Sequence, residues 1–509
     1  MWSHSRNLFT TKVDAAVRWD RYDLVALLFA VFVVIWFSTF KLKTFYDLGY
    51  TSDLFAQVQL ARSWLDGRGL LEDNCFGNML VLHTYFLLLP LGLIAKPFGA
   101  PGLLVVLAAA AGATYFWAVR VLRLLGVHGP LALAAAGALL ASPLAVWFYQ
   151  VSFYGFYVET LVPALCLILF YFLLRRRMIA SIITALAVIS VKEDAPIAAA
   201  IISIVALVET WISSAVEDPR QRLNWPALIT FFLSVLAIPL LLAISWSQPP
   251  TMYAVHSVDQ LGIVRPGTIR GPGALFVFIA SNVTGWLGSS AVRQWLAIMI
   301  VGSFGMIFLR PYYLLFGVVT TVVAWLKNIN DLLWTPRFFL TESFLWCVTL
   351  VVFASLVRVL TSGGRWTRRI TLGVAIIIAM MSASVQLAFL SKVRGAYLLH
   401  SESSYSPLER QQADAVFARY RGEAKPDEPV VASPMLFRYA HDRNLFWLDR
   451  MIGRPAPMWI LSDGTDNYGF DDVRVKDSVV VDRSGRCMLR INDYTLVDRR
   501  GRFMLLRKK

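Results

Sequence analysis

The sequence predicts a polytopic α-helical membrane protein that ends in a small α/β domain. Of its 509 residues, 57% are hydrophobic and 16% are charged. Soluble domains carry about 25% charged residues, so this chain cannot cover a surface in water. Its apolar residues fall in runs that suit membrane spans of about 20 residues. After residue 390 the composition changes abruptly and becomes rich in Asp and Arg. These observations exclude a cytosolic enzyme, a disordered scaffold and a secreted disulfide mini-domain.

The net charge of +15 also has its explanation in the membrane. Basic residues of membrane proteins gather in cytoplasmic loops beside anionic lipid, so we expect membrane lipids and no nucleic acid as partners. The four cysteines form no CxxC pair, which argues against a structural zinc site. Cys166 and Cys347 lie in apolar runs and are expected to be packing residues. A bond between Cys75 and Cys487 is an option that spacing cannot establish.

The N-terminal region predicts an uncleaved signal anchor. Residues 1–22 are a basic, amphipathic lead-in that we place in the cytoplasm. The apolar run 24–40 follows with no small-residue cleavage site behind it, so the anchor is expected to remain. The polar residues 41–78 then lie outside the cytoplasm.

The segment 79–98 decides the topology, because it is apolar enough to span but is broken by Pro90, Gly92 and Pro97. If it only dips into the interface, most loop arginines fall inside, as the positive-inside rule requires. These arginines are Arg120, Arg123, Arg175, Arg176, Arg177, Arg220, Arg222, Arg310, Arg358, Arg365, Arg368 and Arg369.

The resulting map has eleven spans and an external C-terminus. The spans are 23–40, 101–119, 130–149, 159–174, 179–193, 195–212, 226–246, 291–309, 311–326, 339–357 and 370–390. The domains are a lead-in at 1–22, a membrane domain at 23–390 and an external α/β domain at 391–509. Within the membrane domain, 41–100 is a first external loop with interfacial helices, and 247–290 is a second external loop.

The α/β domain is expected to contain a helix and several strands. The helix is predicted at 407–420, with strands at 430–433 and 458–461. A closing pair is predicted between 487–491 and 503–507, joined through the turn region 498–501.

The first candidate site residues are Asp47 and Asp53, which directly follow the first span. Asp53 opens a helix whose apolar positions recur at helical spacing, namely Leu54, Val58, Ala61 and Leu65. Such a helix would lie flat in the interface and hold its N-terminal aspartate at the membrane surface. The alternative is that Asp53, preceded by Ser52, only caps the helix.

The second candidate group lies at the outer ends of two later spans. In VKEDAP, Lys192, Glu193 and Asp194 are flanked by apolar runs on both sides, so a solvated loop explains them poorly. Lys192 either offers a compact positive charge to a phosphate or neutralises its neighbours. In FYGFYVE, Tyr157 suits an interfacial aromatic belt, whereas Glu159 does not.

Four further residues are weaker candidates. His83 in the dipping segment is either a wet interfacial histidine or an acceptor-site group. Arg337 lies just outside a span, where phosphate binding and snorkelling are alternatives. Arg265 and Arg270 lie in a Gly- and Pro-rich loop that could fold over a lipid phosphate.

The order of these features resembles the GT-C superfamily of polytopic glycosyltransferases. It is most similar to the bacterial membrane-protein family catalogued as domain of unknown function 2079. The resemblance rests on YDLGYTSDLF, HTYFLLLPLGLIAKPFG, SFYGFYVETLVPAL, the triple-Arg loop and VKEDAP, and covers roughly residues 40–210 well.

This resemblance implies a bacterial inner-membrane enzyme that transfers a sugar from a polyprenyl-phosphate donor at the periplasmic face. The acceptor would be a glycan, a lipid or a protein. Asp53, or else Asp47, would be the base, while Lys192, Arg337, Arg265 and Arg270 would contact the donor phosphate. Glu159, Glu193, Asp194, His83 and Tyr157 would position the acceptor. No DxD pair is present in the first loop, so the sequence does not decide whether the reaction uses a divalent cation such as Mg²⁺ or Mn²⁺.

Two other functions compete with this one. A lipid-linked sugar transporter or flippase would place ionisable groups near mid-membrane on interrupted spans, often within inverted repeats, and no convincing repeat is present. A non-enzymatic envelope assembly factor would use the tail domain to bind a partner, with the acidic loop serving a structural purpose.

Overall fold

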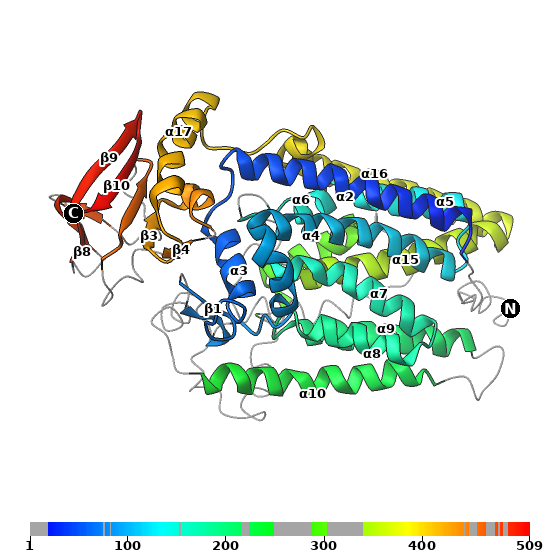
Figure 1. The fold of residues 1–509 in the computed structure, drawn as a ribbon. Coiled ribbons are helices and arrows are strands. Elements are labelled where there is room, and N and C mark those ends of the chain that lie inside the picture. The colour runs from blue at the N-terminus through cyan, green and yellow to red at the C-terminus, as the bar shows by residue number, and fades with distance from the viewer. Residues whose placement is uncertain are drawn as a thin grey trace.

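A helical bundle lies beside a small C-terminal sheet domain in the computed structural model (Figure 1). The structure describes residues 19–74, 77–81, 83–151, 154–214, 223–248, 285, 287–302, 339–441, 443–446, 456–464, 474–476, 479–481 and 487–509. Most of the predicted lead-in and of the second external loop, and the predicted span 311–326, lie outside these residues. So does Cys75, and its bond to Cys487 stays untested.

Two long antiparallel helices define the ends of the bundle. Helix α2 (Arg21–Tyr46) begins with a capping box, in which Asp20 accepts from the backbone of Asp23 and the Asp23 side chain accepts from the backbone of Asp20. Helix α4 (Leu88–Leu124) ends beside it, because Arg123 Nη2 lies 2.6 Å from Asp20 Oδ2. The start of α2 and the end of α4 therefore share one end of the bundle. We call it the arginine end, since Arg120, Arg123 and Arg175 lie there.

The segment between α2 and α4 lies at the opposite end of the bundle, and α4 enters the bundle from there. Helix α4 is broken at Gly99, whose φ of +58° is open to glycine but strained for other residues. The part of α4 before this break packs on helix α3 (Ser52–Arg62) and the turn after it. Trp64 Nε1 donates to the Leu89 carbonyl at 3.0 Å, and Lys96 Nζ donates to the Leu65 carbonyl at 2.8 Å. The part of α4 before Gly99 thus lies beside α3 at this end.

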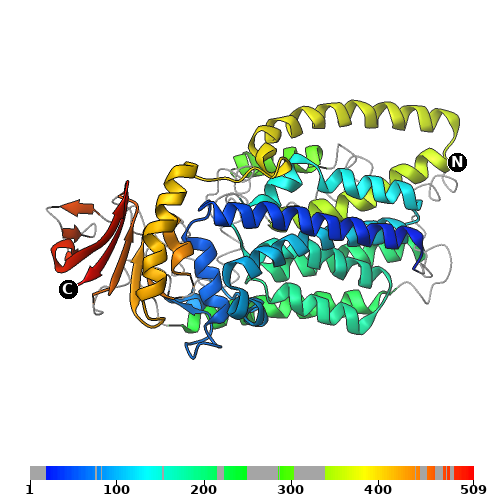
Figure 2. The ribbon, with the colours of Figure 1, turned by 45° about the horizontal axis from the view of Figure 1, so that its top comes forward.

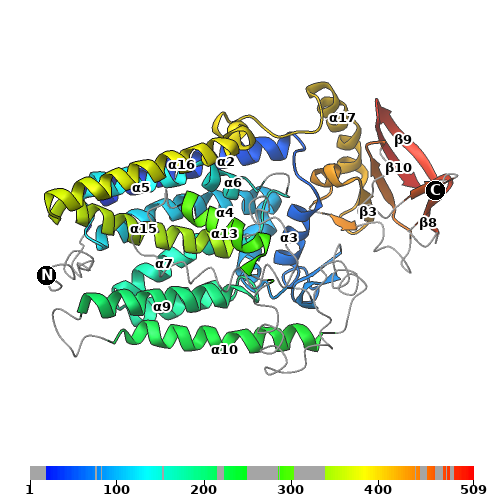
Figure 3. The same cartoon turned by 180° about the vertical axis from the view of Figure 1, so that it is seen from behind.

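The remaining helices complete the bundle. They are α5 (Gly129–Leu140), α6 (Pro143–Gln150), α7 (Val162–Leu174), α8 (Met178–Ile189), α9 (Ala195–Ser214), α10 (Trp225–Ser247), α13 (Ser290–Gly302), α15 (Phe339–Ser362) and α16 (Arg365–Tyr397). Of these, α5, α6, α7 and α15 contact α4. Figure 2 shows α16 along one side of the bundle, followed by the linker to the C-terminal domain, residues 398–406. From behind, α13 lies against α15 and α16 (Figure 3).

Several of these helices have the length and composition of membrane spans. Within the described residues, three are long and apolar enough to cross a membrane, at Arg21–Tyr46, Leu88–Leu124 and Ser343–Ser362. The bent pair α5 and α6 would make a fourth, and shorter apolar helices lie within α7, α8, α9 and α10. Leu28, Phe32 and Ile35 of α2 are more than half exposed, as lipid-facing side chains would be.

The predicted span 130–149 is not one helix. It breaks between α5 and α6 with a bend of 58°. The Ser142 side chain accepts from the Ala145 backbone at 3.3 Å, and Pro143 occupies the first turn of α6. A serine cap followed by proline starts a new helix, which the apolar pattern alone did not reveal.

The C-terminal domain has an α/β fold, as predicted. Helix α17 (Pro407–Glu423) packs on a five-stranded sheet of order β4-β3-β5-β10-β9. Its strands are β3 (Pro429–Ala432), β4 (Asn444–Phe446), β5 (Trp459–Ser462), β9 (Tyr494–Arg500) and β10 (Phe503–Lys508). Strand β3 is parallel to β4 and β5, and β10 is antiparallel to β5 and β9.

The predicted closing pair of this domain is wrong. Strand β10 pairs with β9 around a tight turn at Gly501, where φ is +57°. Strand β8 (Cys487–Arg490), predicted as its partner, pairs instead with β7 (Val479–Val481), which also pairs with β6 (Arg474–Lys476). A two-residue hairpin loop fixes the register of the strands next to it, so the segment adjacent in sequence pairs with β10.

Candidate active site

Helix α3, which carries Asp53 in its first turn, lies where the bundle meets the C-terminal domain (Figure 1). The expectation that its apolar face contacts lipid is wrong, because Leu54, Val58 and Ala61 are fully buried in protein. Its polar side is buried as well: Gln59 Nε2 donates to the Leu445 carbonyl at 3.1 Å. An amphipathic pattern marks a face that needs apolar cover, and here α4 and the C-terminal domain provide it.

Asp53 lies in the first turn of α3, and Thr51 is the N-cap residue. The Tyr157 hydroxyl donates to Asp53 Oδ2. Tyr157 directly precedes the 3₁₀ turn η3 (Val158–Leu161), which leads into α7. The alternative of helix capping therefore does not describe Asp53 fully, since its side chain also joins α3 to a segment about 100 residues later.

Glu159 lies two residues beyond Tyr157 and is buried. Its Oε1 accepts from the Tyr85 hydroxyl at 2.7 Å and lies 3.5 Å from Lys192 Nζ. Its Oε2 is buried and has no hydrogen-bond partner among the described residues. An unsatisfied buried carboxylate oxygen is costly, so it is suited to a hydroxyl of a bound ligand.

Glu193 forms the next contact in this cluster. Its Oε1 lies 2.9 Å from His83 Nδ1, and its Oε2 accepts from the Thr84 backbone N–H at 3.2 Å. Burial alone would raise the pKa of Glu193. The charge of His83 and its hydrogen bond outweigh burial, and with the nearby Lys192 they lower this pKa to about 2. Glu193 is therefore a carboxylate at any pH near neutrality.

Four chain segments thus meet at one end of the bundle, opposite the arginine end. They are the start of α3, the residues 83–87, the turn η3 and the connector 190–194 between α8 and α9. The Leu87 backbone N–H donates to the Ser190 carbonyl at 2.7 Å, which joins the second segment to the fourth. We call Asp53, Tyr85, Tyr157, Glu159, Lys192, Glu193 and His83 the acidic cluster. Asp194, also predicted, lies in the same connector.

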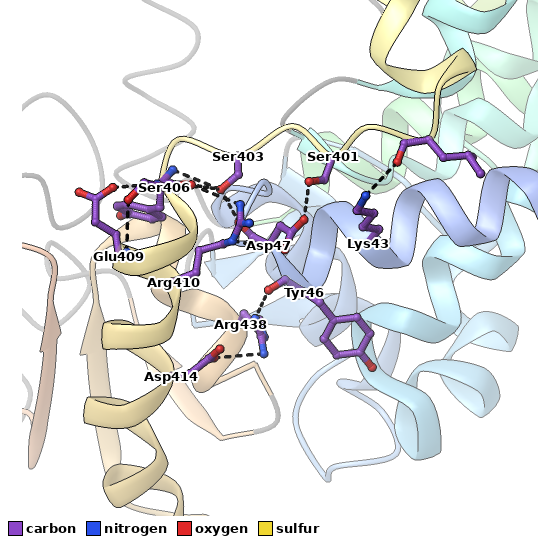
Figure 4. Close-up of polar contacts among 12 residues, drawn as sticks. Lys43, Tyr46, Asp47, Ser401, Ser403, Ser406, Glu409, Arg410, Asp414 and Arg438 are labelled. Carbon is purple, nitrogen blue, oxygen red and sulfur yellow. Dashed lines mark hydrogen bonds and ion pairs between the residues drawn. The ribbon is translucent and has the colours of Figure 1, made fainter.

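Asp47 lies elsewhere, in the joint between α2 and the C-terminal domain (Figure 4). Its Oδ1 is 3.3 Å from Arg410 Nε of α17, and Ser401 of the linker donates to its Oδ2. Next to it, Arg438 donates to the Tyr46 carbonyl and lies 3.4 Å from Asp414. Asp47 therefore takes part in fixing the domain onto the end of α2.

Sequence reasoning missed Tyr85 and found the others one by one. Tyr85 belongs to the HTYF motif that also contains His83, and burial beside Glu159 raises its pKa well above the ordinary value. A tyrosine two residues from a candidate histidine, in a segment predicted not to cross the membrane, is the signal that could have identified it. Arg337, Arg265 and Arg270 lie outside the described residues.

The described part of the chain contains no group of three or more His, Cys, Asp or Glu residues that could hold a metal ion. The divalent cation therefore stays a prediction. Cys166 and Cys347 are free and buried, as expected for packing residues. Neither family models nor curated proteins give a match to this chain.

The chemical capacity of the acidic cluster follows from its donors and acceptors. It combines three carboxylates, of which two accept from tyrosine hydroxyls, with a single lysine. Such a site can accept a proton and orient hydroxyl groups, and its lysine can contact one anionic group.

Proposed function

We propose that this protein is a membrane glycosyltransferase that moves a sugar from a polyprenyl phosphate to an acceptor glycan, lipid or protein. The observation that carries the proposal is the acidic cluster, in which Asp53 and the Glu159–Lys192 pair lie at one end of an apolar helical bundle. Ionisable groups at a membrane end are costly, and carboxylates that outnumber their cations there favour a site at this end.

The reaction suits these groups. A sugar phosphate already contains a good leaving group, so a strong acid is unnecessary. A carboxylate is needed to take the proton of the acceptor hydroxyl, and a cation is needed to stabilise the charge that builds on the leaving phosphate. A single displacement of this kind inverts the anomeric centre.

Asp53 is the better candidate for the base. Asp47 contacts Arg410 and Ser401 in the domain joint, whereas Asp53 contacts Tyr157 next to Glu159. Tyr157 would orient the Asp53 carboxylate, and transfer of the acceptor proton to Asp53 would accompany attack on the anomeric carbon. Asp47 would then help to hold the domain in place.

Lys192 is the candidate contact to the donor phosphate. It is 3.5 Å from Glu159 Oε1, so the donor phosphate would share its charge with this carboxylate. The open Oε2 of Glu159 would accept from a sugar or acceptor hydroxyl, and Glu193, Asp194 and His83 would position the acceptor. Arg337, Arg265 and Arg270 are further candidates for the phosphate. The polyprenyl chain would lie along the apolar helices, at the face directed away from the cytoplasm.

The test measures polyprenyl phosphate released from a panel of polyprenyl-phosphate hexoses and pentoses by the purified protein in lipid vesicles, in the presence of a panel of glycan, lipid and protein acceptors. Loss of a general base lowers the rate by about 10²–10⁴-fold, which is the effect expected of Asp53→Asn. Asp47→Asn is the matched control and is expected to lower thermal stability more than turnover. Full activity of a folded Asp53→Asn variant would remove Asp53 from the mechanism. Absence of release from every donor by the wild-type protein would contradict the proposed reaction.

A further inference from the structure

Lys41 is a fully buried lysine near the end of α2. Its Nζ donates to the carbonyl of Gln150 and to the carbonyl of Gly155, the latter at 3.2 Å. The ring of Tyr50 lies on another side, with its centroid 5.6 Å from Nζ. Burial of a lysine is costly, so a lysine in this place needs partners that fix its geometry.

One of these carbonyls belongs to Gln150, the last residue of α6, and the other to Gly155, two residues before Tyr157. Val151 and Gly155 both have positive φ, at +49° and +78°. Packing also disfavours a side chain at Gly155, because a Cβ there would come within 3.1 Å of Tyr50 and 3.2 Å of Leu54. A left-handed conformation is open to glycine but unfavourable for valine, so Val151 needs other contacts to hold it in place. The ammonium group of Lys41 supplies two such contacts.

The linker to the C-terminal domain contributes the balancing charge. Gln150 Nε2 donates to Glu402 Oε1, and Gln150 is itself buried. Burial raises the pKa of Glu402, while the positive charge of Lys41 and the hydrogen bond from Gln150 oppose this effect. Glu402 directly follows Ser401, which bonds to Asp47 in the domain joint. The same linker therefore reaches both the joint and Gln150, whose carbonyl Lys41 holds.

We propose that Lys41 is a positioning residue that holds the Gln150 and Gly155 carbonyls, so that Tyr157 meets Asp53, with Glu402 of the linker as its counter-charge. Lys41 acts through backbone carbonyls and does not contact substrate. The catalytic meaning of the Tyr157–Asp53 contact rests on the proposed function, but the contact itself can be measured without any sugar donor.

The experiment places 3-fluorotyrosine at position 157 of the full-length protein and records its ¹⁹F spectrum in detergent micelles. Asp53→Ala removes the acceptor and gives the reference signal for a lost hydrogen bond. Lys41→Met is expected to move the signal towards this reference. Lys43→Met is the matched control two residues along α2. Lys43 Nζ contacts only the Leu399 carbonyl of the linker in the described structure, at 3.4 Å, and its loss should leave the signal in place.

Lys41→Met leaves the half-buried Glu402 without its counter-charge and could fail to fold. The double variant Lys41→Met/Glu402→Gln removes both charges, and it is expected to fold while still giving the shifted signal. A wild-type signal from either folded variant would overturn the proposal, because the lysine would then have no part in placing Tyr157.

A second readout separates this proposal from the proposed function. In the release assay, the double variant should lower kcat by about 10²-fold, since small misplacements of a reacting group have effects of that size, and should leave the donor KM unchanged. The Lys41 variants could shift the ¹⁹F signal while the wild-type protein transfers no sugar. This result would contradict the proposed function but support the positioning role of Lys41. Normal kcat with a shifted signal would contradict the role of the Tyr157–Asp53 contact in the reaction.

Discussion

The two ends of the helical bundle hold their charges in different ways. At the arginine end, Asp20 and Asp23 face Arg120 and Arg123 with N···O distances of 2.6 to 2.9 Å. At the opposite end, the carboxylates of the acidic cluster accept mainly from hydroxyl, imidazole and backbone N–H groups. The single lysine of the cluster lies 3.5 Å from one of them.

This difference distinguishes a structural role of the arginine end from the chemistry that we propose for the acidic cluster. Two acids matched with two arginines form closed ion pairs, which hold the start of α2 to the end of α4. Acids that outnumber their cations, with one buried oxygen left open on Glu159, are instead available to a ligand. Substitutions at the arginine end should therefore mainly lower the stability of the fold. Substitutions in the acidic cluster should mainly lower the proposed transferase activity.

The largest effect is expected at the arginine end, from Arg120→Met. It leaves the fully buried Asp23 without one of its two arginine partners. Breaking a buried ion pair in this way costs about 3–5 kcal/mol of the free energy of unfolding. Unfolding of the purified protein by increasing SDS measures it. The double variant Asp23→Leu/Arg120→Met should recover most of the loss, and no recovery would show that the two residues do not act as a pair.

At the acidic cluster, Lys192→Ala should act on donor binding. Loss of one contact to a charged group weakens binding by about 1.5–3 kcal/mol, or roughly ten- to a hundredfold. The donor KM in the release assay should rise by this factor while the acceptor KM stays unchanged. Lys96→Ala is a suitable control, because Lys96 is half exposed and lies on the adjacent part of α4. An unchanged donor KM would return Lys192 to the role of neutralising its neighbours.

Glu193→Gln should alter the acid stability of the protein. The pKa of Glu193 is lowered to about 2 from an ordinary value of 4.5, so its contribution to folding is fully present above pH 4.5 and is lost as pH falls towards 2. Thermal unfolding between pH 5.5 and about 2.5 should therefore show a smaller acid loss in the variant than in the wild type. Parallel curves would contradict the ion pair with His83.

Glu402→Gln should give a smaller effect of the opposite sign. Burial raises the pKa of Glu402, so the folded protein binds this proton more tightly than the unfolded chain does. That contribution is present below pH 4.5 and is lost as pH rises through the folded-state pKa. The variant should gain stability relative to the wild type as pH increases from 4 to 7 in the same thermal assay. A relative loss over this range would show that the carboxylate is stabilised in place.

Local patterns predicted most helices of this protein. The α2, α9, α10 and α17 segments begin within two residues of their predicted starts, because apolar runs and caps are features of neighbouring residues. The break at Ser142 and the β9–β10 hairpin were missed, although serine before proline and a glycine turn are both visible in the sequence.

The contacts within the candidate site could be predicted much less well. The sequence indicated the candidate residues one at a time, because ionisable groups beside apolar spans are costly. These residues are Asp53, Glu159, Lys192, Glu193 and His83. Their pairing joins residues up to 110 positions apart, which no local pattern encodes. The burial of α3 by protein was missed for a related reason. An apolar helix face has the same sequence pattern whether lipid or protein covers it. The role of Lys41 was not predicted because its partners are backbone carbonyls, which every residue type has.

The most direct test of the account is a cryo-electron microscopy structure of the purified protein in nanodiscs with added polyprenyl phosphate. We predict density for the phosphate in contact with Lys192, within the acidic cluster and near Asp53. A phosphate bound instead among Arg120, Arg123 and Arg175 would contradict the assignment of chemistry to the acidic end.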